Sequence, residues 1–285
     1  MVQNKQGIDS DDEVRARGPV ARFFLSGWNN LVRLMASNAL FVIFNIPSII
    51  LSFFISGAFV PLIAPLFIDL KAYIDPVTGS DAAILELYFL LVFFGVNALV
   101  SSTLVCIGPF QAGFAKVYKD IRNNTSVSFF SSFSEGMKTN WKKSLAAMII
   151  GLLITPVLLL AIYFYFGMNS VTGSVIGVVF AVLLVAFVLI QNFVYQMIVS
   201  TDLKLSKIYK NALIFLFVRF IPCLGAASVV IVFYAVLPLF LLLSASYLTL
   251  GIFMFLYTFV VISWVQYFLS CFSGSLIDRY VASEE

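Results

Sequence analysis

Few side chains of this sequence have the types and spacing that catalysis needs. The 285 residues include no histidine, so neither a histidine-based nucleophile triad nor a histidine-ligated zinc site can be built. No two carboxylates fall within the apolar runs, and no phosphate-binding G-x-x-x-x-G-K-[ST] loop occurs. The three cysteines, Cys106, Cys223 and Cys271, have neither metal nor redox spacing. The sequence therefore predicts a protein that is not an enzyme, with no catalytic residue, metal site or cofactor.

Polar side chains inside long apolar runs are the remaining chemical candidates. An ionisable residue is costly in a membrane, and Arg219 lies nine residues past Lys210, about 13 Å along a helix. Its long stem can return the charge to the lipid headgroups, or its guanidinium can bind Gln191 or Gln196. Asn45 and the two glutamines suit hydrogen bonds between helices, or else the path of a polar solute.

Membrane helices must position these side chains, because 61% of the residues are hydrophobic and 11% are charged. Soluble domains have about 45–50% and about 25%, and a helix needs roughly 20 apolar residues to cross the hydrocarbon core. We therefore predict an all-α, polytopic membrane protein with a disordered tail (1–17) and a single membrane domain (18–285) that opens with an amphipathic lead-in (18–37). Six spans are expected at about 39–67, 82–118, 144–166, 175–201, 211–244 and 248–276.

The distribution of basic residues orients the predicted spans. Lys and Arg are kept out of short translocated loops. All of the seventeen except Lys71 fall in or beside the N-terminal segment, the second and fourth connections and the C-terminal tail, whereas the first connection is mainly acidic. Both termini of this multi-pass protein are therefore expected in the cytoplasm.

The connection from about Lys116 to Lys143 is the longest on the basic side. It mixes aromatic and charged side chains, which suits either lipid headgroups or a protein partner. It is either a solvated seam held on the bilayer by its aromatic residues or a docking surface. The candidate contact residues are Asp120, Arg122, Phe129, Phe130, Phe133, Glu135, Lys138 and Trp141.

A proline recurs at a similar depth in the odd-numbered spans. Pro47, Pro156 and Pro222 lie fourteen, thirteen and twelve residues after the last interfacial basic residue, which places them about 18–21 Å deep. Proline removes a helical hydrogen bond and kinks a helix, and neighbouring helices can compensate for this in a membrane. The pattern fits three related helical hairpins with kinked odd helices, or chance, since proline is common in membrane helices.

Gly108 and Pro109 mark an expected irregularity in the second span. Proline moves the preceding residue away from the helical region, and glycine tolerates that conformation. A bend or break is therefore expected there, either as a structural kink or as a place where backbone groups face a cavity.

The stretch "GPFQAGFAKVYKDIRNNTSVSFFSSFSEGMKTNWKKSL" resembles the signature of the YesL-like family of bacterial integral membrane proteins, and "NALFVIFNIP" resembles that family's first span. The specific match covers about 38–47 and 107–150. About sixty residues separate Pro47 from Gly108, more than in shorter members. The resemblance implies a multi-span α-helical protein of a bacterial cytoplasmic membrane, without an assigned molecular activity, encoded beside sugar-uptake and glycan-degradation genes.

Two functions are compatible with these observations. The first is a non-catalytic accessory to bacterial carbohydrate uptake or utilisation, whose partners are the lipid bilayer and subunits of an ATP-driven carbohydrate importer. The alternative is a sugar transporter or channel in its own right, which the prolines and Gly108-Pro109 favour and the scarcity of charges at depth opposes. A pore-forming importer subunit is disfavoured, because "SEGMKTN" does not match the coupling motif of such permeases. No nucleic-acid partner is expected.

Overall fold

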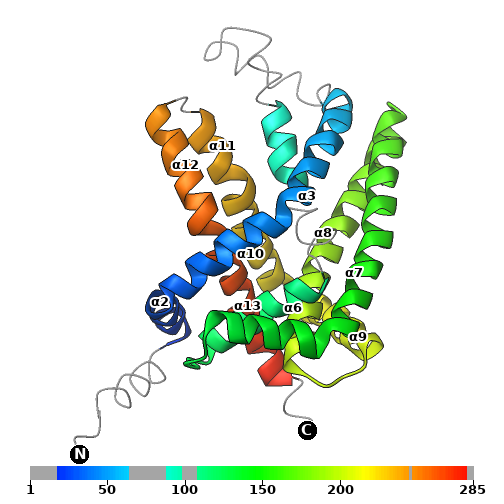
Figure 1. Ribbon diagram of the computed structural model, residues 1–285. Helices are drawn as coiled ribbons and strands as arrows, with labels where there is room; N and C mark the ends of the chain where they lie inside the picture. The colour runs from blue at the N-terminus through cyan, green and yellow to red at the C-terminus, as the bar shows by residue number, and fades with distance from the viewer. Residues whose placement is uncertain (1–17, 64–87, 98–107, 244–245, 281–285) are drawn as a thin grey trace, which may run out of the picture.

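The computed structural model describes residues 18–63, 88–97, 108–243 and 246–280, and all the elements in these ranges are helical (Figure 1). Within them, four helices are long and apolar enough to cross a membrane: Leu31–Leu62, Phe129–Gly167, Val171–Ser200 and Phe220–Leu242. The bent pair Tyr247–Phe259 and Val261–Tyr280 makes a fifth if it counts as one span. The prediction of an all-α chain with several membrane-length helices is confirmed.

Two helices form the N-terminal part of the described chain. α2 (Pro19–Asn29) starts with a proline in its first turn, where the missing N–H is not needed. It is amphipathic, as predicted for the lead-in, but it ends at Asn29, and the long α3 (Leu31–Ile63) begins at once. The first membrane-length helix therefore starts eight residues earlier than the predicted span, and Pro47 and Pro61 both lie inside it.

The region of the second predicted span does not form one membrane-length helix in the described residues. Tyr88–Asn97 is a short apolar helix, residues 98–107 lie outside the described ranges, and the described chain resumes at Gly108 with α6 (Gly108–Arg122). α6 contains Lys116, Lys119 and Asp120 among its apolar residues, so it cannot lie in hydrocarbon on all sides. In Figure 1 it lies at one end of the long helices, together with α9 and the last turns of α13. We call this the basal end.

The third long helix is much longer than its predicted span. α7 (Phe129–Gly167) has 39 residues, or about 58 Å at 1.5 Å per residue, whereas the hydrocarbon core is about 30 Å thick. Figure 1 shows its first part running across the basal end before the helix turns upward beside α8 (Val171–Ser200). Part of the predicted connection is therefore helical and continuous with the third span, with Pro156 inside the helix.

The remaining helices contain two interruptions that were not predicted. α9 (Leu205–Val218) ends at Arg219, whose φ of −119° and ψ of 40° are not helical, and α10 (Phe220–Ile231) follows. The membrane-length segment continues through the π-helix η2 (Val232–Val236) and α11 (Leu237–Leu243). α12 (Tyr247–Phe259) and α13 (Val261–Tyr280) meet at an angle of 44°.

Pro222 illustrates the effect of the first interruption. It is the third residue of α10, within the first turn, where a proline breaks no helical hydrogen bond. Pro47 and Pro156, in contrast, lie inside continuous helices. The three prolines therefore differ in their position within a helix, although their spacing from basic residues is similar.

Candidate functional site

The contact between α6 and the start of α7 is so close that it depends on glycine. A Cβ atom added to Gly136 would lie 2.5 Å from Lys116 Cβ and 2.7 Å from the Ala112 carbonyl oxygen. A Cβ on Gly108 would lie 2.5 Å from the Ser144 carbonyl oxygen. Gly108 thus permits close packing of α6 against α7. The bend or break predicted at Gly108 and Pro109 depends on residues 98–107, which lie outside the described ranges.

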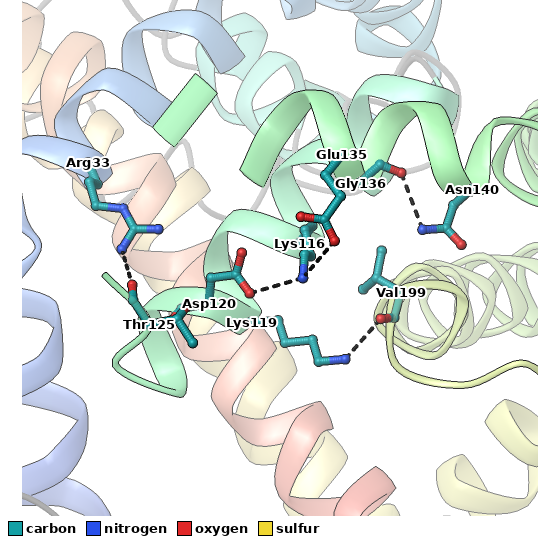
Figure 2. Close-up of polar contacts among 9 residues, drawn as sticks. All are labelled: Arg33, Lys116, Lys119, Asp120, Thr125, Glu135, Gly136, Asn140 and Val199. Carbon is teal, nitrogen blue, oxygen red and sulfur yellow. Dashed lines mark hydrogen bonds and ion pairs between the residues drawn. The ribbon is translucent and has the colours of Figure 1, made fainter. Parts of the chain in front are cut away.

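An ion cluster joins the same two helices (Figure 2). Lys116 Nζ lies 3.3 Å from Asp120 Oδ1 on its own helix and 3.3 Å from Glu135 Oε1 on α7. Asp120 is buried, whereas Glu135 is exposed. Partial burial lowers the pKa of Lys116, but the charges and hydrogen bonds of Asp120 and Glu135 outweigh it, so the pKa is raised overall. Lys116 therefore stays positively charged at neutral pH.

A second lysine of α6 binds the end of α8. Lys119 Nζ donates to the Val199 carbonyl oxygen at 3.0 Å (Figure 2), one of the last carbonyls of a helix that ends at Ser200. Such carbonyls lack a partner within the helix and carry the negative end of its dipole. Burial, together with the neighbouring charges of Lys116 and Arg122, lowers the pKa of Lys119.

The C-terminus of α6 is held by three other helices. Asn124 adopts a φ of 53°, and the Thr125 N–H bonds to the Asp120 carbonyl at 2.9 Å, which is the pattern of a Schellman cap. The Ser26 hydroxyl of α2 donates to the Ile121 carbonyl at 2.6 Å. From α3, Arg33 donates to the Thr125 carbonyl at 3.0 Å (Figure 2).

α13 supplies the third of these attachments. Arg122 Nη1 donates to the Ser270 carbonyl at 3.4 Å, and its Nη2 lies 3.4 Å from Asp278 Oδ2. With its contacts to α2, α7, α8 and α13, and the hydrogen bond from Ser37 of α3 to the Tyr118 hydroxyl, α6 braces the basal end of the molecule.

The predicted contact residues do not form one surface. Asp120, Phe129 and Phe133 are buried, and the Arg122 side chain is only 16% exposed. The two phenylalanines belong to the apolar core formed with Phe114, Tyr118, Leu34 and Tyr267. The expectation that Phe129 and Phe133 hold the segment on the bilayer is wrong, because α6 covers the face of α7 from which they project.

The other candidates form an exposed surface on the first part of α7. Phe130 is 71% exposed and Trp141 is 49% exposed, and Glu135 and Lys138 are exposed between them. Lys142, also exposed, places its Nζ 5.7 Å from the centre of the Trp141 ring. We call these five residues the outer face of α7.

Gln191, Gln196 and Arg219, three of the four polar candidates at depth, have partners on other helices. Gln191 Nε2 donates to the Tyr209 hydroxyl at 3.1 Å, and Gln196 Oε1 accepts from Ser270 at 3.0 Å. Arg219 binds neither glutamine. Its Nη2 donates to the Tyr280 hydroxyl, and its guanidinium lies over the Tyr280 ring, 5.6 Å from the centre.

An asparagine that was not among the candidates supports the break between α12 and α13. Asn38 is fully buried in α3; its Nδ2 donates to the Tyr257 carbonyl at 2.8 Å, and its Oδ1 accepts from the Ser263 N–H at 2.7 Å. Both backbone groups flank the break at Val260, so one amide replaces hydrogen bonds that a continuous helix would make. The apolar sequence "YTFVVISW" contains neither glycine nor proline and gives no local signal of this break.

A small cavity of about 70 Å³ lies beside the break. Asn45, Tyr234 and Tyr257 line it, and the Tyr257 hydroxyl donates to the Phe233 carbonyl in the π-helix. Asn45 Nδ2 donates to the Phe41 carbonyl of its own helix, while its buried Oδ1 has no partner among the described residues. At about 30 Å³ per water molecule, the cavity has room for roughly two waters.

Within the described ranges, no group of three or more His, Cys, Asp or Glu side chains could hold a metal ion. Comparison of the chain with family models, curated proteins and solved structures finds no match.

Proposed function

We propose that this chain is a non-catalytic, multi-pass protein of the bacterial cytoplasmic membrane that assists a carbohydrate uptake system, and that it binds an importer subunit through the outer face of α7. The link to carbohydrates rests on the resemblance of the α6–α7 sequence to the YesL-like family, to which we propose the chain belongs. The docking part rests on the geometry of α7.

The observation that carries the proposal is the rigid presentation of exposed charges and aromatic rings. Gly136 and the Lys116 ion cluster hold the first part of α7 against α6, while Phe130, Lys138 and Trp141 point outward from it. A surface that is already ordered loses little conformational entropy when a partner binds. Aromatic anchors surrounded by charges also suit a specific protein contact.

A charge-reversal variant tests the docking surface. Lys138→Glu with Lys142→Glu reverses two positive charges on the surface that the partner would contact, but it leaves Phe130 and Trp141 in place as membrane anchors. We expect normal insertion and a loss of roughly tenfold or more in the importer subunits recovered from native membranes in mild detergent.

The matched control is Lys207→Glu with Lys210→Glu, which reverses two exposed lysines on α9 at the same end of the molecule. It should retain the partner. Equal recovery of importer subunits by both variants and the unmodified protein would show that the outer face of α7 is only a solvated surface.

We also propose that the basal end faces the cytoplasm and that the chain crosses six times, with Tyr88–Asn97 in the second crossing. Support comes from the described lysines and arginines, which lie on segments of the basal end. In a background without native cysteines, Met168→Cys, in the connection between α7 and α8, should react with an impermeant thiol reagent outside intact cells. Lys138→Cys should not react with the reagent. Labelling of Lys138→Cys would show that the basal end faces the outside of the cell.

Transport of a sugar by this chain alone is the second candidate. The break between α12 and α13 and the adjoining π-helix favour it, because interrupted membrane helices often surround solute sites and π-helices often occur at functional sites. The cavity of about 70 Å³ opposes it, since ligand pockets commonly measure about 300–1,000 Å³. Flux of labelled sugar into vesicles containing only this protein would favour transport over the accessory function.

A further inference from the structure

A second and larger hollow lies at the basal end, away from the outer face of α7. This cleft of about 600 Å³ is enclosed by α2, the capped end of α6 and the last turns of α13. Its charged and amide-bearing residues are Arg22, Arg122, Asn123, Asn124 and Asp278, and Phe23 and Tyr267 form an apolar wall. Its volume is in the range of pockets that hold small ligands.

α13 holds Arg122 in position. Arg122 is held by the Ser270 carbonyl and by Asp278, and its guanidinium lies directly on the backbone of α13. A Cβ atom on Gly274 would fall 0.9 Å from Arg122 Nη1, so glycine at this position makes the space for the guanidinium. Arg22, on the opposite wall, has an exposed side chain.

The cleft adjoins a helix face suited to the membrane surface. Val20, Phe24 and Trp28 of α2 are 69%, 58% and 69% exposed and recur every four residues, so they form one apolar stripe. An amphipathic helix with such a stripe lies in the interface between headgroups and acyl chains. The other side of α2 contributes Arg22, Phe23 and Ser26 to the cleft, which places the cleft at headgroup depth.

We propose that this cleft binds the phosphate group of a membrane phospholipid between Arg22 and Arg122. A guanidinium forms paired, charge-assisted hydrogen bonds with a phosphate, and the exposed amide of Asn123 adds a further donor. The ring of Phe23, stacked on Tyr267 with centres 5.1 Å apart, contacts the apolar part of the lipid beside the headgroup. Inorganic phosphate shares the recognised chemistry but lacks the acyl chains that α2 would contact.

The test is native mass spectrometry of the full chain in detergent containing equal amounts of phosphatidylglycerol and a phosphate-free glycolipid with the same acyl chains. We expect the phospholipid to be retained at least tenfold more than the glycolipid. Arg22→Gln should remove most of this preference, since it deletes one charged partner of the phosphate from an exposed position. Lys207→Gln, which replaces an exposed cation on α9 outside the cleft, should leave the preference unchanged.

Asp278→Asn supplies an independent variant, because Asp278 competes with the phosphate for Arg122 and is 64% exposed. Removing its charge should raise phosphatidylglycerol retention several-fold. Equal retention of the glycolipid, or a preference unaffected by both Arg22→Gln and Asp278→Asn, would overturn the proposal. Displacement of the lipid by inorganic phosphate at equal concentration would also overturn it, by showing that the site prefers the free anion.

Discussion

Replacing Gly136 with alanine isolates the energetic role of the contact between α6 and α7. The new methyl group would lie 2.5 Å from Lys116 Cβ, 2.7 Å from the Ala112 carbonyl oxygen and 3.1 Å from Gly113 Cα. These are atoms of the facing backbone or one bond from it, so no flexible side chain can move away to make room. The two helices would have to separate, which would also lengthen the ion pair between Lys116 and Glu135.

The magnitude follows from two opposing contributions. Alanine is favoured over glycine inside a helix by about 1 kcal/mol, whereas overpacking a tight contact costs about 1–3 kcal/mol. Gly57→Ala in α3 is the matched control, because no atom lies within 4 Å of its added Cβ. The helical preference is common to both variants and cancels, so Gly136→Ala should be less stable than Gly57→Ala by about 1–3 kcal/mol.

Unfolding of the purified protein in mixed micelles by sodium dodecyl sulfate, followed by circular dichroism, measures this difference. A second readout is susceptibility to protease cleavage between α6 and α7, which should rise only in Gly136→Ala. If the two variants unfold at the same detergent fraction, then Gly136 does not lie at a close contact between α6 and α7.

Two further substitutions test the interrupted helices. Asn38→Leu leaves the Tyr257 carbonyl and the Ser263 N–H without partners, so it should lower the free energy of unfolding by about 2–5 kcal/mol. The control, Asn192→Leu, loses only a bond within its own helix and should change the free energy of unfolding little. Similar losses for both variants would contradict the role of Asn38. Arg219→Lys should leave the amount of folded protein nearly unchanged. The partner of Arg219 is Tyr280 at the exposed end of α13, and a lysine can also place its charge at the headgroups. Severe loss of folded protein would show that the planar guanidinium is required.

The helical character of the chain and the presence of several membrane-length apolar helices could be predicted well, because both depend on short-range properties. A run of about 20 apolar residues costs too much to expose to water, wherever the rest of the chain lies. The membrane-length α8 accordingly differs from its predicted span by a few residues. The ends of spans were predicted less well where a helix continues past the membrane, as α7 does, or stops at a residue such as Arg219.

The candidate surface on α7 was predicted only in part, for a reason visible in two neighbouring residues. Phe129 and Phe130 have the same chemistry and adjacent positions, yet one is 7% exposed and the other 71%. Helical periodicity alone separates two such faces, but only the position of α6 shows which of them is covered. Asp120 and Arg122 were expected at a surface for the same reason, because their charges gave no sign of the partners Lys116 and Asp278.

Local composition was therefore enough to predict an all-helical chain with several apolar helices of membrane-crossing length, since hydropathy sums over neighbouring residues. The arrangement at the basal end depends instead on contacts between distant parts of the chain. Ser26 and Ile121 are 95 residues apart, Arg122 and Ser270 are 148 apart, and Asn38 and Ser263 are 225 apart. In each pair a side chain or backbone group of one helix forms a hydrogen bond with a distant helix, and such complementarity exists only once the helices have packed together.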